Sequence, residues 1–411
     1  MNTFEFCGKI ALGKETEKFK PIEVRTFDSG WTNTTLRFNC ISDTNRVLCL
    51  SQGGKWKDDK KNSIKTFSKT VKDENGNVIK GENITIPWDQ RFDKEQIGRV
   101  AGFKKFVCDL GDLKTRYALQ NLVKAFESNG DTDALVEQTG IDNLEDAKDA
   151  LERSWAKRKE FLAECDFTEY LIKVCQSEKM RDKRFNISGS YDVQYNPVNG
   201  KFYTNYHVNR VTLAADDAEP STKMEIDFFF GEDAWDDSVY EETGKCFING
   251  WVTYYDSNKE IRNHGFKPIT ITVKEDEKKV RGLKRKFDTD EKIKQIGLTL
   301  KVIEGAERKE ITIEMLDDET REDIECGLLS FDDVKKALGG NTFGDRISEL
   351  RYVELTATKN IVKDTIYSID DMHPAKKKAA AKEESRDVAQ EINDIMKDME
   401  SELPFDLDDD L

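Results

Sequence analysis

The chain has 411 residues, of which 36% are charged, and a formal net charge of -16 at pH 7. A chain of this length can bury two or three hydrophobic cores, so its stability requires neither disulfides nor structural metals. No stretch approaches the roughly 18 to 20 apolar residues that span a bilayer, and the sequence does not open on a basic segment followed by an apolar one. We therefore expect a cytoplasmic protein with no membrane partner.

The eight cysteines are scattered, without a Cys-x-x-Cys pair, and the three histidines lie far from them in the sequence. This pattern argues against a sequence-local zinc site and against a disulfide-stapled secreted fold. The sequence also has no G-x-x-x-x-G-K-S/T loop, no H-E-x-x-H and no G-x-S-x-G. We expect no enzymatic activity, no catalytic residue, no cofactor and no metal.

Charge is unevenly distributed along the chain. Residues 398–411 include seven acids and no base. Bases cluster in two other places, Lys55, Lys57, Lys60 and Lys61, and then Lys278, Lys279, Arg281, Lys284, Arg285 and Lys286. Lys and Arg supply the affinity for nucleic-acid phosphates, so an acidic chain with basic clusters can still bind nucleic acid. Each cluster alone is also typical of a solvated surface.

Hydrophobic periodicity predicts a mainly β chain with α insertions, which is the α+β fold class. Alternation in residues 4–10, 35–40 and 46–50, with polar turns between them, predicts a small β-barrel in residues 1–112. The spacing of apolar residues then changes to a helical period, which predicts a helical insertion in residues 113–184.

Strand character returns after residue 184. A hairpin and further extended runs predict a second barrel in residues 185–287. Residues 288–372 alternate between strand and helix patterns and predict a smaller third α+β module. Residues 373–411 form a charged linker and an acidic end, whose low hydrophobicity and high charge predict disorder.

Aromatic side chains are interleaved with bases inside the predicted strands. Proteins that bind single strands combine a positive groove with aromatic platforms, and each stacked base contributes ~1 to 3 kcal/mol. Trp56 lies between two lysines in a polar segment, where burial is hard to arrange. The competing interpretation is that most of these aromatics fill cores. The candidate DNA-binding residues are Trp31, Lys55, Trp56, Lys57, Trp88, Arg91, Lys104, Lys105, Lys201, Tyr203, His207, Arg210, Tyr254, Arg281, Lys284, Arg285 and Lys286.

The two strand-rich modules resemble OB-fold domains, which are five-stranded barrels that bind oligonucleotides. The acidic end around Pro404 and Phe405 resembles the tip of bacterial and phage single-stranded DNA-binding proteins. Six residues follow the Pro-Phe pair here, whereas the pair normally stands at the extreme C-terminus. The resemblance implies a tail that recruits replication, recombination or repair enzymes, and its partner-binding residues would be Leu403, Pro404, Phe405, Asp406, Leu407, Asp408, Asp409 and Asp410.

Two hypotheses follow from the sequence. The favoured one is a non-enzymatic protein, of phage type, that coats single-stranded DNA in the bacterial cytoplasm and recruits enzymes through its tail. The alternative is an acidic scaffold or interaction protein of a phage or replisome that binds no nucleic acid.

Overall fold

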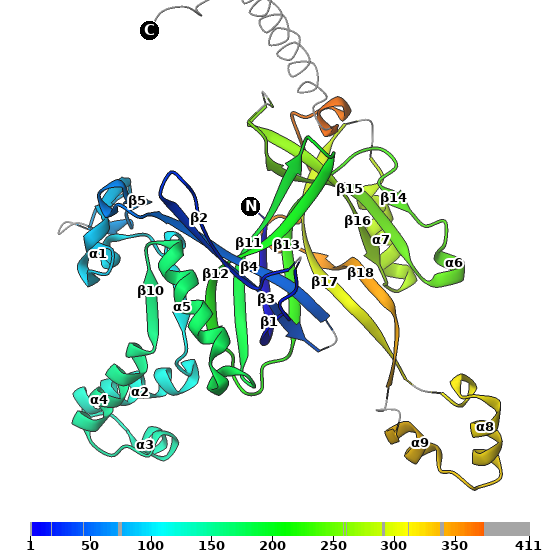
Figure 1. The fold of residues 1–411 in the computed structure, drawn as a ribbon, viewed down its shortest axis with the longest axis horizontal. Coiled ribbons are helices and arrows are strands. Elements are labelled where there is room, and N and C mark those ends of the chain that lie inside the picture. The colour runs from blue at the N-terminus through cyan, green and yellow to red at the C-terminus, as the bar shows by residue number, and fades with distance from the viewer. Residues whose placement is uncertain are drawn as a thin grey trace, which may run out of the picture.

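The structure is a computed structural model that describes residues 2–373, apart from residues 18, 44, 73–75, 258, 260, 290–291, 311 and 338–340. For residues 306–310, 336 and 341–346 only the backbone is described. The expected tail and its candidate partner-binding residues lie outside the described residues. The described part is a mixed α+β structure, mostly of strands, with one large sheet (Figure 1). This agrees with the expected fold class.

Five strands pair in a closed order, which we call ring 1. They are β1 (Thr3–Leu12), β3 (Trp31–Ser42), β4 (Asn45–Trp56), β11 (Arg184–Asn196) and β12 (Lys201–Leu213). Antiparallel pairing joins β1 to β3, β3 to β4, β12 to β11 and β11 back to β1. A parallel pairing closes the ring, with Cys49 opposite Tyr206 and Leu50 opposite His207. A short strand, β2 (Ile22–Thr26), pairs with the beginning of β3.

Side chains that alternate along the strands fill the interior of ring 1. Leu36 and Phe38 are fully buried in β3, and Phe4 and Phe6 fill the interior from β1. Successive residues of a strand point to opposite faces. Arg37, between Leu36 and Phe38, therefore lies on the outer face of the ring.

Residues 57–183 form an insertion between β4 and β11. Its first part contains η1 (Asp59–Lys61), β5 (Ser63–Phe67), β6 (Val71–Lys72), β7 (Val78–Ile79), β8 (Asn83–Pro87), η2 (Trp88–Gln90), α1 (Lys94–Arg99) and η3 (Gly102–Lys104). Its second part contains β9 (Phe106–Asp109), α2 (Leu113–Glu127), α3 (Asp133–Thr139), α4 (Leu144–Ala156), β10 (Arg158–Phe161), α5 (Glu164–Gln176) and η4 (Glu178–Met180). Helices α2 to α5 thus occur in the range where the sequence predicts a helical period.

Helix α5 covers one end of ring 1. It buries Phe167 and Leu171 in the interior of the ring. The hydroxyls of Ser51 and Thr168 form a buried hydrogen bond of 2.7 Å between β4 and α5. At Gly53 any β-carbon would overlap the backbone of α5, so a glycine is required for this close approach.

Five further strands form ring 2. They are β13 (Ser221–Phe230), β15 (Cys246–Tyr255), β16 (His264–Val273), β17 (Lys294–Glu310) and β18 (Asn341–Leu355). Antiparallel pairing joins β13 to β15, β15 to β16, β18 to β17 and β17 back to β13, and a parallel pairing joins β16 to β18. Helix α7 (Glu277–Phe287) lies between the third and fourth strands, as α5 does in ring 1. Both rings thus have the same order of pairing along the chain.

The rings are joined into one sheet. Strand β1 pairs with β13 antiparallel, so the first strands of the two rings are neighbours. The end of the β11–β12 hairpin contacts ring 2, where Tyr195 and Phe202 pack against Tyr254. Figure 1 shows α2 to α4 at one end of the molecule and α8 (Asp318–Glu325) and α9 (Phe331–Ala337) at the other.

The pairings differ from the expected modules in two places. The hairpin β11–β12, expected to open a second barrel at residue 185, pairs with β1 and β4 of ring 1. Strands β17 and β18, expected in a third module, belong to ring 2. Backbone hydrogen bonds join strands irrespective of their side chains, so the strand pattern alone does not specify the partner.

The remaining elements lie around ring 2. They are β14 (Trp235–Asp236), α6 (Tyr240–Thr243), η5 (Ile313–Met315), β19 (Lys363–Asp364) and η6 (Ile369–Met372). Tyr367 and Met372 from the last described segment pack against Phe266 of β16. No helix in the described ranges is long and apolar enough to cross a membrane.

Candidate nucleic-acid interface

Two tryptophans face each other at one end of the β3–β4 strand pair. Trp31 begins β3 and Trp56 ends β4, and the pairing places them directly opposite each other. Their ring centroids are 5.2 Å apart at an interplanar angle of 70°. Both side chains are partly exposed, and the ammonium of Lys61 lies 5.6 Å from the Trp56 ring. Aromatic rings with a cation beside them are the platforms on which bases stack.

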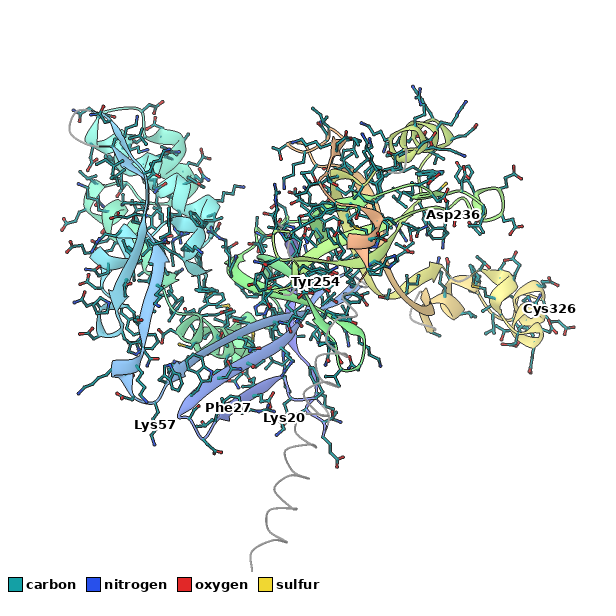
Figure 2. All side chains as sticks on the ribbon, turned by 90° about the horizontal axis from the view of Figure 1, so that it is seen from above. Lys20, Phe27, Lys57, Asp236, Tyr254 and Cys326 are labelled. Atoms are coloured by element: carbon teal, nitrogen blue, oxygen red, sulfur yellow. The ribbon has the colours of Figure 1, made fainter. Side chains whose placement is uncertain are left out.

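A cavity of about 710 Å³ lies against this tryptophan pair. Phe27, which is 46% exposed, lines it from the segment before β3, and Glu164 lines it from α5. Asn33 and Gln52 add amide groups on the outer face of the two strands. Figure 2 shows Phe27 between Lys57 and Lys20 along one side of the molecule.

A second, separate cavity of about 730 Å³ is also lined by residues of these two strands. Arg37 and Arg46 line it from β3 and β4, and Asn205 lines it from β12. The paired residues Cys49 and Tyr206 line it too, and so does Glu304 of β17. We call the two cavities together the β3–β4 groove. Aromatic rings are at one end of the groove and guanidinium groups are at the other.

The guanidinium of Arg37 is held in place by its neighbours. Its Nη1 atom donates to the carbonyl of Lys20 at 3.2 Å and lies 3.4 Å from Glu23 on β2. Arg46 is exposed on the outer face of β4. The two arginines place positive charge on the outer face of the strand pair.

His207 connects the groove to α5. It lies on β12 next to Leu50, and its Nδ1 atom is 3.7 Å from a carboxylate oxygen of Glu164. The Glu164 carboxylate raises the pKa of His207, and partial burial opposes this effect. His207 therefore carries its proton at a higher pH than an ordinary histidine.

Of the candidate residues, the structure brings Trp31, Trp56, Lys57 and His207 to the groove or its border. Lys55 points to the other face of β4, where its Nζ atom forms a 2.7 Å ion pair with Glu169 of α5. The Glu169 carboxylate raises the pKa of Lys55.

Two candidate aromatics are buried and must be reassigned to cores. Trp88 is 8% exposed and packs with Ile64, Ile86 and Leu162. Tyr254 is 6% exposed and packs at the junction of the two rings. A base cannot stack on a ring that is already enclosed by side chains. The competing interpretation, that such aromatics fill cores, therefore describes these two residues.

The other candidates on the insertion and the β11–β12 hairpin are dispersed. Lys105 forms a 2.9 Å ion pair with Glu160, and Lys104 lies 5.9 Å from the exposed ring of Phe103. Lys201, Tyr203 and Arg210 are exposed along β12, and Tyr203 accepts a hydrogen bond from Asn199. Arg91 stacks against aromatic rings within the insertion.

The four basic candidates on α7 lie on ring 2 rather than at the groove. Helix α7 buries Val280 and Leu283 and leaves its basic face exposed. Within that face Lys284 forms a 2.7 Å ion pair with Asp237, and Arg281 lies 3.4 Å from Glu277. Arg285 and Lys286 are exposed beside them. Figure 1 places α7 and α5 on opposite sides of the molecule.

The groove also contains residues that sequence reasoning missed. Arg37 and Arg46 each stand next to a buried strand residue, and Phe27 stands in a polar segment before β3. Extending the period-2 pattern through β3 and β4 identifies both arginines as outward-facing. In the part of the chain that the structure describes, no group of three or more His, Cys, Asp or Glu side chains could hold a metal ion.

No family model matches this chain, and no curated protein matches it. Among solved structures, the chain is similar to a deletion mutant of the single-stranded DNA binding protein from Thermus aquaticus. The two are 6% identical, with a TM-score of 0.28, and the match covers 74% of this chain and 87% of that chain. Similarity at this level does not assign a fold or a function.

Proposed function

We propose that both rings are OB-type barrels and that ring 1 binds single-stranded DNA through the β3–β4 groove. The OB-fold is a five-stranded Greek-key barrel whose second and third strands carry the oligonucleotide face. Among the five strands of ring 1, taken in chain order, the second and third are β3 and β4. The groove therefore lies where an OB-type barrel binds its ligand.

The observation that carries this proposal is the Trp31–Trp56 pair at one end of the groove, with Arg37 and Arg46 at the other end. Two partly exposed aromatic rings at the end of a strand pair offer flat apolar faces to a ligand. Bases offer flat rings to stack on them, and the phosphates between the bases attract Arg37 and Arg46. This binding is independent of sequence, as expected for a protein that coats single strands without an enzymatic reaction.

Titration with fluorescent oligo-dT at low and high salt tests the proposal. We expect binding that weakens as salt rises, and Trp56→Ala should weaken it by about 1 to 3 kcal/mol with little change in melting temperature. Tyr255→Ala is the matched control, because Tyr255 is 75% exposed but lies on ring 2. Absence of binding even at low salt would refute the proposal and favour the scaffold alternative.

We also propose that the acidic end of the chain recruits replication or recombination enzymes. The support is its sequence: seven acids without a base surround Leu403, Pro404, Phe405 and Leu407. Carboxylates with apolar side chains between them suit a basic pocket with a hydrophobic floor.

A further inference from the structure

Phe92, in the first part of the insertion, has an exposed ring beside a fixed cation. The side chain is 55% exposed. The guanidinium carbon of Arg91 lies 4.3 Å from the centroid of Phe92 and 4.1 Å from the centroid of Trp88. Arg91 thus contacts a buried ring and an exposed ring.

Two polar contacts fix the position of Arg91. Its Nε atom donates to a carboxylate oxygen of Asp166 at 2.8 Å, and its Nη1 atom donates to the carbonyl of Trp88 at 2.8 Å. The Asp166 side chain is nearly buried, at 9% exposure. Because Arg91 is held on both sides, the Phe92 ring that packs on it has a preset position. We call Arg91 and Phe92 the insertion ledge.

Two sets of contacts relate the insertion ledge to the β3–β4 groove. Asp166 follows Glu164, a groove-lining residue, within the first turn of α5. On the other side, Lys61 lies over the Trp56 ring, and its short helix η1 packs against η2, which begins at Trp88. A strand of nucleic acid that leaves the tryptophan pair on this side would therefore meet the ledge next.

We infer that the insertion ledge is a second stacking platform, on which a base of the same single strand packs against Phe92 as the strand leaves the groove. The inference rests on the proposed function of the groove. The exposed face of the Phe92 ring, held in position by Arg91, offers a flat surface on which a base can stack. With this platform, one protein chain contacts a longer stretch of single-stranded DNA than ring 1 alone does.

The test compares Phe92→Ala with the unchanged chain on oligo-dT of increasing length, from about 4 to 30 nucleotides, because single barrels occlude ~4 to 16 nucleotides. The shortest oligonucleotides that bind should show equal affinity for both proteins. Longer ones should bind Phe92→Ala roughly 5- to 150-fold more weakly, the equivalent of one lost stack. Phe92→Tyr keeps the ring and should restore the affinity.

Tyr117→Ala is the matched control, because Tyr117 is 65% exposed on α2, away from the groove. If Phe92→Ala binds with unchanged affinity at every length while Trp56→Ala binds more weakly, the stacking role of the ledge is refuted. DNA binding by the groove is then still supported. An equal loss at every length would also overturn it, because the ledge would then not be a separate platform. If Trp56→Ala is unchanged as well, the proposed function itself fails.

Discussion

Gly54 lies against the indole of Trp31 across the β3–β4 pair: a β-carbon at Gly54 would overlap Cζ2 of Trp31. The indole of Trp31 thus occupies space that is open only because residue 54 has no side chain. Gly54→Ala should displace the Trp31 indole and weaken oligo-dT binding by about 1 to 3 kcal/mol, the value of one stack. Fluorescence titration measures the loss.

Gly98→Ala provides the control for Gly54→Ala. A β-carbon at Gly98 in α1 would meet no atom within 4 Å. Alanine is favoured over glycine in a helix by about 1 kcal/mol, so this variant should be slightly more stable and should bind oligo-dT unchanged. Full binding by Gly54→Ala would show that the position of the Trp31 indole does not matter for the ligand.

The two groove arginines should account for more salt dependence than the bases of α7. Neutralising Arg37 and Arg46 to Gln should flatten the slope of log affinity against log salt by ~0.7 units for each lost phosphate contact. Neutralising the α7 bases should change the slope less, since they lie on ring 2 rather than at the groove. Those bases are Arg281, Lys284, Arg285 and Lys286.

The comparison of slopes is made by titrating both variants over a range of salt concentrations. A larger change for the α7 variant would move the phosphate path from ring 1 to ring 2. The two variants can be compared even if their overall affinities differ, because the slope reports ionic contacts alone.

A buried ion pair anchors the helical part of the insertion. Asp109 on β9 is fully buried and accepts two hydrogen bonds, of 2.6 and 2.8 Å, from Arg116 on α2. Removing Arg116 leaves the buried Asp109 with only the more distant Arg158, 3.6 Å away, as a charged partner. Breaking a buried pair in this way costs about 3 to 5 kcal/mol. We expect Arg116→Met to destabilise the chain by this amount in urea unfolding, and Asp109→Leu with Arg116→Met to be closer to the original stability.

The same pair predicts a dependence of stability on pH. Burial would raise the pKa of Asp109, but hydrogen bonds from Arg116 and Gly111 outweigh it and hold the pKa below its ordinary value. The stabilisation is therefore present above the ordinary carboxyl pKa and is lost as pH falls through the lowered pKa. In the urea experiment described above, a double variant Asp109→Leu/Arg116→Met as unstable as Arg116→Met alone would contradict the assignment of the cost to the Asp109 charge.

His207 and Glu164 predict a second pH effect, of opposite sign. Because Glu164 raises the pKa of His207, the pair stabilises the fold fully below the unfolded histidine pKa of about 6.5. This stabilisation is lost as pH rises through the raised pKa. Urea midpoints measured from pH 5 to 9 should fall more steeply for the unchanged chain than for Glu164→Gln. Parallel curves would refute the coupling.

Deleting residues 398–411 should tighten oligonucleotide binding. The segment carries seven acids and no base, and a tethered anion can reach an effective concentration of ~mM beside the bases of its own chain. The gain should be largest at low salt, where screening is weakest. Phe405→Ala removes a ring and no charge, so it should abolish partner capture and leave DNA affinity unchanged. Weaker binding after the deletion would refute the competition.

The strands of ring 1 are predictable from local pattern because alternation is a local property. Phe4, Phe6, Leu36 and Phe38 alternate with polar residues, and the structure buries all four in ring 1. The partners of these strands are not predictable in this way. The closing contact between Cys49 and Tyr206 joins residues from opposite sides of the insertion, and nothing in either local sequence specifies the other.

The same limit explains which site residues were misassigned. Trp88 has Pro87 and Asp89 as neighbours, a polar setting that suggests exposure, but Leu162 and Ala163 arrive from a distant segment and cover it. Tyr254 is covered by Tyr195 and Phe202 of the other ring. Burial of a surface-type segment depends on what packs over it, and that information lies elsewhere in the chain.

The position of the insertion has a consequence for how the chain is made. During translation β1, β3 and β4 leave the ribosome first, and the strands that complete ring 1 follow only after residues 57–183. At ~5 to 20 residues per second, this interval is on the order of ten seconds. Over that time β4 has an unpaired edge, which is a template for wrong pairing with other nascent chains. In ring 2 the matching interval, between β16 and β17, is only residues 274–293. Ring 1, which we propose binds the ligand, is therefore the part of the newborn chain most dependent on protection by chaperones.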